Sequence, residues 1–234
     1  MIRLQNFFHF VTGRKTSPST AGVRSKIVFT LWMIPVLFFV VLLSSMIQMI
    51  CFRWGIVDPV RSLGIIPSYM KSMSSCQIML EIAIVAPLFE ECAFRGPLQN
   101  NVKWFRLGLV AFFYLIICRI AGLNFYEISA PTSAIFKFAL ITMVIPKKYI
   151  LTFINYLNTD FLRGILIWCS AFSFGFWHYY NFDFSQSDIL SIVVTLLPFI
   201  LNGFILSYVA VKNGLLWSVI LHALNNIWPL ILWL

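Results

Sequence analysis

Long apolar runs without charge limit what this chain can fold into. The clearest run is residues 27–51, where 25 successive positions carry no charge, and about 20 apolar residues are enough for a helix to cross a bilayer. Hydrophobic residues make up 60% of the chain and charged residues 11%, whereas soluble domains are about one-quarter charged. In lipid, each backbone N–H and C=O needs an internal partner, which an α-helix supplies. The sequence therefore predicts an all-α, polytopic transmembrane helical bundle.

Several further segments are apolar enough to cross the membrane, and we expect about seven spans, with a range of six to eight. The short segment 133–145 is counted as a span, and 149–157 fits either an interfacial helix or its continuation. Pro97 cannot donate a hydrogen bond to Ala93, so the second helix should bend or end just after Arg95. The seven predicted spans are residues 27–51, 77–99, 107–122, 133–145, 162–180, 189–211 and 215–234.

Basic residues set the expected orientation. Residues 1–26 contain five Lys or Arg and no acid, so the positive-inside rule predicts a basic cytoplasmic N-terminal tail. A transmembrane domain of residues 27–234 follows, with the motif core in 77–234, and its partner is the lipid bilayer. The net charge is +9, but Lys and Arg are scattered among short connections. We therefore expect no nucleic-acid partner.

The five cysteines show no CxxC spacing, so they indicate neither a disulfide framework nor a thiolate metal site. They fall mostly in apolar segments. We expect them to be buried thiols that pack as small hydrophobic groups.

An acidic pair interrupts the second apolar segment. Eight Asp or Glu residues occur in the chain, and two of them, Glu90 and Glu91, are adjacent. A carboxylate inside a bilayer costs several kcal/mol, which makes such a pair a functional-site hypothesis. On a helix, Glu91 and Arg95 share a face and can pair, while Glu90 points about 100° away. We expect Glu91 to be held by its ion pair with Arg95 and Glu90 to be available for chemistry.

Two later segments place imidazoles in the membrane. His178 follows Phe174 by one turn, and a single His among aromatic residues is more often simply packed. His222 and Asn226 share a helix face, where their alternative role is to join helices by hydrogen bonds. Together with the acidic pair, these groups suit amide hydrolysis. A carboxylate can take a proton from water, an imidazole can orient that water, and a His and an Asn can stabilise an oxyanion.

The order of these motifs, EExxxR, FxxxH and HxxxN, resembles that of the CAAX-protease and bacteriocin-processing family of intramembrane glutamic endopeptidases. This family includes the prenyl-protein endopeptidases. The resemblance extends from Glu90 to Asn226 and implies that Glu90 activates the attacking water with help from His178. It also implies that His222 and Asn226 stabilise the oxyanion.

The same resemblance assigns supporting roles. Glu91 and Arg95 would hold the motif in shape, and Phe174 would pack beside His178. The family implies a site without metal or cofactor, with zinc bound by two His and a Glu as the alternative. The implied substrate is a peptide or protein at the membrane, either prenylated or unprenylated.

The spacing of the motifs departs from the family pattern. Residues 96–177, 82 in all, separate Arg95 from His178 and contain two extra predicted spans, which preserve the antiparallel relation of the flanking helices. Glu90 is expected at mid to inner depth and His178 near the outer end of its span. Either the His178 helix begins later than predicted or the site is a tilted, water-filled cavity.

Two other functions remain open. A catalytically inactive family member would act as a membrane immunity or scaffold protein through its helix surfaces. A proton-coupled transporter could use the carboxylate pair, but it is expected to show broken helices and paired repeats, and the sequence shows neither.

Overall fold

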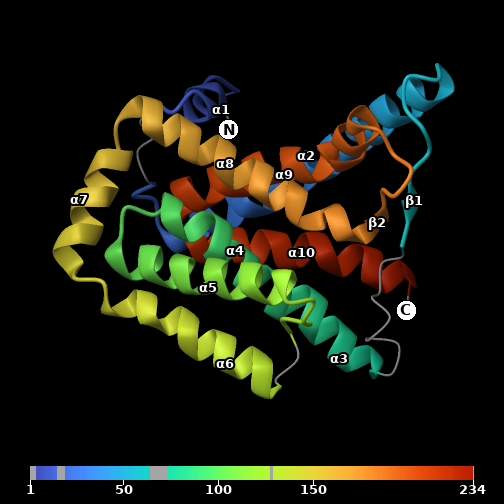
Figure 1. Ribbon diagram of the computed structural model, residues 1–234. Helices are drawn as coiled ribbons and strands as arrows, with labels where there is room; N and C mark the ends of the chain where they lie inside the picture. The colour runs from blue at the N-terminus through green and yellow to red at the C-terminus, as the bar shows by residue number, and fades with distance from the viewer. Residues whose placement is uncertain (1–3, 15–18, 64–72, 127–128, 234) are drawn as a thin grey trace.

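The computed structural model describes residues 4–14, 19–63, 73–126 and 129–233, and these residues form a helical bundle (Figure 1). Two-residue strands β1 and β2 pair antiparallel and tie the connection after α2 to the one after α8. The elements are α1 (Leu4–Val11), α2 (Val23–Arg53), β1 (Arg61–Ser62), α3 (Ser75–Leu80), η2 (Glu81–Val85), α4 (Ala86–Arg95), η3 (Gly96–Leu98), α5 (Val102–Ile120), α6 (Ala130–Ala139), η4 (Leu140–Val144), α7 (Lys147–Leu157), α8 (Asp160–Trp177), η5 (His178–Asn181), β2 (Phe182–Asp183), α9 (Ile189–Asn213) and α10 (Leu215–Trp233).

The all-α prediction is confirmed. Within the described residues, α2 and α9 are long and apolar enough to cross a membrane, with mean hydropathies of 2.6 and 2.4, and Ala130–Val144 and Leu215–Ile227 are shorter apolar helices. A count of seven spans is not confirmed. The cytoplasmic orientation of the N-terminus stays a prediction.

The helix that carries the acidic pair is continuous from α3 through η2 to α4, but its middle is widened. Ser74 caps its start in a reciprocal capping box with Gln77. Pro87 has no N–H to donate one turn back, and the preceding turn, η2, is a π-turn in which the N–H of Ala86 reaches the carbonyl of Glu81. The carbonyl of Ile82 is thereby left for a partner on another helix.

Pro97 ends this helix as predicted. α4 stops at Arg95, and Gly96–Leu98 form the single 3₁₀ turn η3. The carbonyl of Arg95, left exposed by this ending, accepts a hydrogen bond from Nε2 of Gln99 at 3.4 Å. The acidic pair therefore lies in the last two turns of a helix whose end is fixed.

α9 is the central helix and packs against α2, α8 and α10. It approaches α8 closely because Gly203 faces the backbone of Ala171, and a Cβ at Gly203 would lie 2.8 Å from the Ala171 oxygen. The hydroxyl of Ser170 donates to the carbonyl of Phe94 at 2.7 Å and lies 3.2 Å from the hydroxyl of Ser207. These contacts bring α4, α8 and α9 together around the acidic pair.

Substituting Gly203 with Ala is expected to lower the free energy of unfolding by about 1–3 kcal/mol, because the new methyl group meets the α8 backbone and not a side chain that can turn away. Thermal unfolding in detergent measures this change. Ser173→Ala, on the exposed face of α8, is the matched control. Equal melting temperatures for the Gly203→Ala and Ser173→Ala variants would contradict the close approach.

The extra segment between the motifs forms α5, α6, η4 and α7. Figure 1 shows α5 and α6 side by side and α7 at the edge of the bundle, joining α6 to α8. α7 is a separate amphipathic helix that buries Ile150 and Ile154 against Phe105 and exposes aromatic residues such as Tyr156. This geometry favours the interfacial alternative for residues 149–157.

Two features differ from expectation. Part of the basic N-terminal segment forms α1, whose Phe10 is fully buried against Tyr208 of α9; residues 1–3 and 15–18 of that segment lie outside the described residues. The cysteines are free thiols, but the expected burial holds for Cys118 alone, and Cys76 and Cys169 are exposed. Apolar sequence context does not distinguish a core-facing position from a lipid-facing one.

Candidate active site

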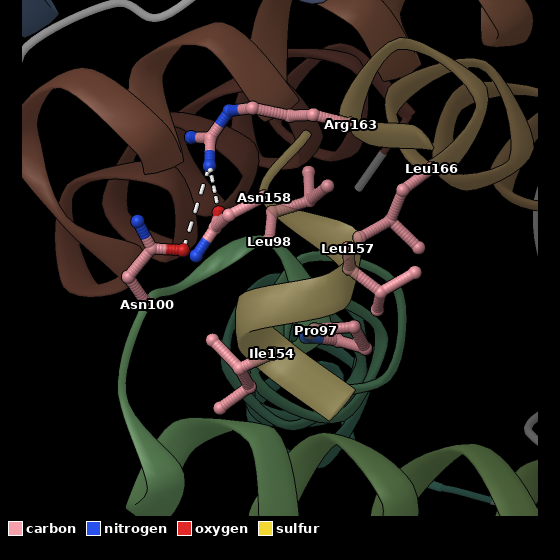
Figure 2. Close-up of a pocket in the computed structure, with 8 residues that line it drawn as sticks. All are labelled: Pro97, Leu98, Asn100, Ile154, Leu157, Asn158, Arg163 and Leu166. Carbon is pink, nitrogen blue, oxygen red and sulfur yellow. Dashed lines mark hydrogen bonds between the residues drawn. The ribbon is translucent and has the colours of Figure 1, made fainter. Parts of the chain in front are cut away.

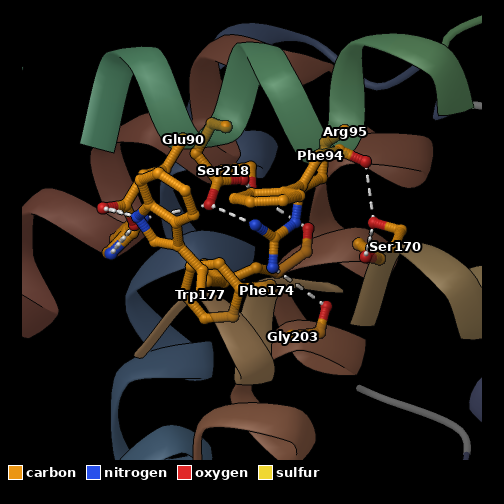
Figure 3. Close-up of polar contacts among 12 residues, drawn as sticks. Glu90, Phe94, Arg95, Ser170, Phe174, Trp177, Gly203 and Ser218 are labelled. Carbon is orange, nitrogen blue, oxygen red and sulfur yellow. Dashed lines mark hydrogen bonds and ion pairs between the residues drawn. The ribbon is translucent and has the colours of Figure 1, made fainter. Parts of the chain in front are cut away.

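The predicted ion pair forms on α4. Nη1 of Arg95 lies 3.1 Å from Oε1 of Glu91, one helical turn away, and both side chains are fully buried. Nη2 of Arg95 donates to the carbonyl of Gly203 on α9 at 3.3 Å, and its guanidinium stacks 4.1 Å from the ring of Phe174 on α8 (Figure 3). Arg95 thus connects three helices at the acidic pair.

Glu91 is hydrogen-bonded to two side chains of α10. Its Oε2 accepts a hydrogen bond from the hydroxyl of Ser218, and its Oε1 lies 3.0 Å from Nδ1 of His222. A carboxylate next to the Arg95 guanidinium accepts hydrogen bonds, so Nδ1 of His222 carries a proton. Glu91 therefore fixes the orientation of the imidazole.

The other ring nitrogen of His222 faces the second glutamate. Nε2 lies 3.9 Å from Oε2 of Glu90, and the exposed fractions of the two side chains are 4% and 8%. The imidazole of His222 thus bridges the acidic pair, bound to Glu91 on one side and close to Glu90 on the other. Sequence analysis placed these three residues in one site, and the structure brings them together.

Glu90 accepts two hydrogen bonds, both on Oε1. The indole Nε1 of Trp177 donates at 3.1 Å and the hydroxyl of Tyr126 at 3.2 Å. Figure 3 shows Trp177 approaching Glu90 from below α4. Since Trp177 ends α8, the C-terminal end of α8 meets the last two turns of the glutamate helix, which is the continuous helix of α3, η2 and α4. The expected difference in depth between Glu90 and the His178 region therefore does not separate them.

His178 lies beside this cluster. Its Nδ1 is 2.8 Å from the carbonyl of Phe174, and its ring stacks on Phe199 at 4.3 Å. A carbonyl can only accept, so Nδ1 carries a proton and Nε2 of the neutral ring has a free lone pair. The ring of Phe174 lies 4.8 Å from that of His178 and 5.3 Å from that of His222, so Phe174 packs against both imidazoles.

Asn226 is placed differently from the other predicted residues. Its Nδ2 donates to the carbonyl of Ile82 at 3.0 Å, the carbonyl that the π-turn leaves free. This contact lies about two turns from Glu90 along the glutamate helix. One N–H of the Asn226 amide is thus used to hold α10 on η2, and the second remains for another acceptor.

Three contributors to the cluster were missed by sequence reasoning. Ser218 lies four residues before His222, so a polar stripe at this spacing on α10 could have predicted it. Trp177 precedes His178 and was read as one of several aromatic neighbours. Tyr126 comes from the connection between α5 and α6, and no sequence pattern marks it.

A shallow pocket lies away from the acidic pair, between η3, α7 and α8 (Figure 2). At its polar end, Nη1 of Arg163 donates to Asn158 at 2.9 Å and to Asn100 at 3.4 Å. No Asp, Glu or His lines this pocket, so it has no carboxylate or imidazole that can act as a general base. The candidate site is therefore the carboxylate cluster, meaning Glu90 and Glu91 with the side chains that contact them.

Among the described residues, no three His, Cys, Asp or Glu side chains come together as a group that could hold a metal ion. The expectation of a site without metal or cofactor, and its zinc alternative, remain predictions to be tested with a chelator.

Comparison with known proteins gives one match. Residues 73–228, which include every residue of the carboxylate cluster, match a family described as type II CAAX prenyl endopeptidase Rce1-like. No curated protein and no solved structure matches the chain. The matched segment is 156 of the 234 residues, counting from 73 through 228. The chain therefore belongs to the type II CAAX prenyl endopeptidase Rce1-like family, a family of membrane proteases.

Proposed function

We propose that this protein is an intramembrane endopeptidase in which Glu90 activates the water that attacks a peptide carbonyl. The observation that carries the proposal is that the two glutamates of the acidic pair have different partners. Glu91 is bonded to Arg95, Ser218 and His222, whereas Oε2 of Glu90 faces Nε2 of His222 without a hydrogen bond at 3.9 Å. A buried carboxylate with an available oxygen is suited to general-base work.

The proposed reaction follows from these positions. Oε2 of Glu90 takes a proton from water as the water oxygen bonds to the carbonyl carbon, and the carbonyl oxygen becomes an oxyanion. The C–N bond then breaks, and Glu90 returns the proton to the leaving amine. Nε2 of His178 carries the lone pair of that ring, because Nδ1 donates to the carbonyl of Phe174. We propose that this nitrogen orients the water.

α10 is proposed to stabilise the oxyanion. The second N–H of the Asn226 amide is available to donate, and Nε2 of His222 can donate when that ring is protonated. Glu91, Arg95 and Phe174 would act as supports. Glu91 holds the ring of His222, and the ring of Phe174 packs against the guanidinium of Arg95. A proposed substrate is a peptide at the membrane, and the family match favours a prenylated C-terminal tail.

A panel of fluorogenic peptides, each made with and without a prenyl group, tests the proposal. The purified protein in detergent is expected to cleave at least one of them, to retain this activity in a strong chelator, and to lose it on Glu90→Ala substitution. Loss of activity in the chelator, restored by zinc, would favour the metal alternative. Failure to cleave the panel and a broad proteomic set of membrane peptides would favour an inactive member that acts through its surfaces.

A further inference from the structure

We propose that Tyr126 and Trp177 form a donor clamp on Oε1 of Glu90 and thereby assign Oε2 as the oxygen that takes the proton from water. This inference rests on the proposed function. Both donors reach the same carboxylate oxygen, at 3.2 and 3.1 Å, and a carboxylate oxygen has two lone pairs with which to accept them. Oε2 is then the oxygen left to accept a proton, and it is the one that faces His222.

The indole of the clamp is held rigidly. Trp177 is 8% exposed, and its ring lies 5.1 Å from that of Phe125 and 6.1 Å from that of Phe94. The guanidinium of Arg119 stacks over it at 4.2 Å, a cation–π contact that limits rotation of the indole. The direction of the Trp177 N–H is therefore fixed before any substrate binds.

The phenol of the clamp is held by different contacts. The hydroxyl of Tyr114 on α5 donates to the carbonyl of Phe125 at 2.6 Å, and the N–H of Tyr126 donates to Oδ1 of Asn124 at 3.1 Å. The ring of Tyr126 packs in a cluster with Ile78 and Ile82 of the glutamate helix. Both the backbone and the ring of Tyr126 are thus anchored beside Glu90.

The clamp gives the extra segment between the motifs a role at the site. Tyr126 belongs to the connection between α5 and α6, which lies inside the extra segment of α5 to α7, residues 102–157. That segment therefore supplies one of the two donors to Glu90. Tyr126 and Trp177 act through Glu90 and are positioning residues.

Steady-state kinetics of the full-length protein on a cleaved peptide test the clamp. Tyr126→Phe removes one donor and keeps the ring, and it is expected to lower kcat about tenfold with KM and melting temperature unchanged. Trp177→Phe removes the other donor and should lower kcat by a similar factor with KM unchanged, but it also shortens a buried side chain, so its melting temperature should fall. Tyr149→Phe, on the exposed side of α7, and Trp104→Phe, at the exposed start of α5, are the matched controls and should keep the wild-type kcat.

A double-mutant cycle separates positioning from a general structural effect. In the Glu90→Asp background the shorter carboxylate no longer reaches both donors, so Tyr126→Phe should lower kcat by less than twofold. The clamp would be overturned by a wild-type kcat in both single variants, by a change confined to KM, by a loss of kcat in Tyr126→Phe that accompanies a lower melting temperature, or by full additivity in the Glu90→Asp background. Absence of Glu90-dependent cleavage by the unmodified protein would instead overturn the proposed function.

Discussion

Glu90→Gln is expected to lower kcat for peptide cleavage by about 10²–10⁴ while the protein stays folded. The Gln carbonyl oxygen can still accept the hydrogen bonds of Tyr126 and Trp177, so the packing around position 90 is retained. The amide nitrogen that replaces Oε2 cannot take a proton from water. Kinetics at saturating peptide, together with thermal unfolding, separate the loss of the base from a loss of structure.

A second acid on the same helix provides the control for this prediction. Glu81 belongs to the π-turn η2 and is only partly buried, and it makes no contact with the carboxylate cluster in the described structure. Glu81→Gln should therefore keep kcat within about twofold of the wild type. If Glu90→Gln retained more than about one-tenth of the wild-type kcat, Glu90 would not be the general base.

Arg95→Met is expected to lower the free energy of unfolding by about 3–5 kcal/mol, a large fraction of the stability of a typical protein. The substitution removes the cation that lies 3.1 Å from Glu91 at a position with no exposed surface. It also removes the donor to the carbonyl of Gly203. Glu91 would remain as a buried carboxylate without its counter-charge, and this unpaired charge is the main cost.

The double variant Glu91→Gln/Arg95→Met tests that cause. Removing the charge at position 91 as well should restore part of the lost stability, because no unpaired ion is then buried. Chemical unfolding in detergent measures both variants, and Lys103→Met, at an exposed cation of α5, should be close to wild type. A double variant less stable than Arg95→Met would contradict the account.

Short-range geometry explains what the sequence could predict. The pair of Glu91 and Arg95 follows from helical spacing, and the end of α4 follows from the chemistry of Pro97. The π-turn η2 had a signal in Pro87 that was overlooked. In each case the cause lies within one or two turns of its effect, so the residues alone contain the information.

Contacts between distant segments explain what could not be predicted. The oxyanion role of Asn226 stays a proposal, but its hydrogen bond to the carbonyl of Ile82, 144 positions earlier, was not predicted. Tyr126 reaches Glu90 because the connection after α5 folds back over the glutamate helix. Such contacts depend on the packing of whole helices, and the spacing of polar residues within one helix does not encode them.

The bridging of the acidic pair by His222 has a consequence for biosynthesis. Ser218 and His222, which bond to Glu91, belong to α10, the most C-terminal helix described. The ribosome makes α4 more than a hundred residues before α10. During synthesis the two glutamates are therefore made before the imidazole that contacts them. The complete carboxylate arrangement, and with it the proposed activity, can form only after α10 has been made and has packed against α4.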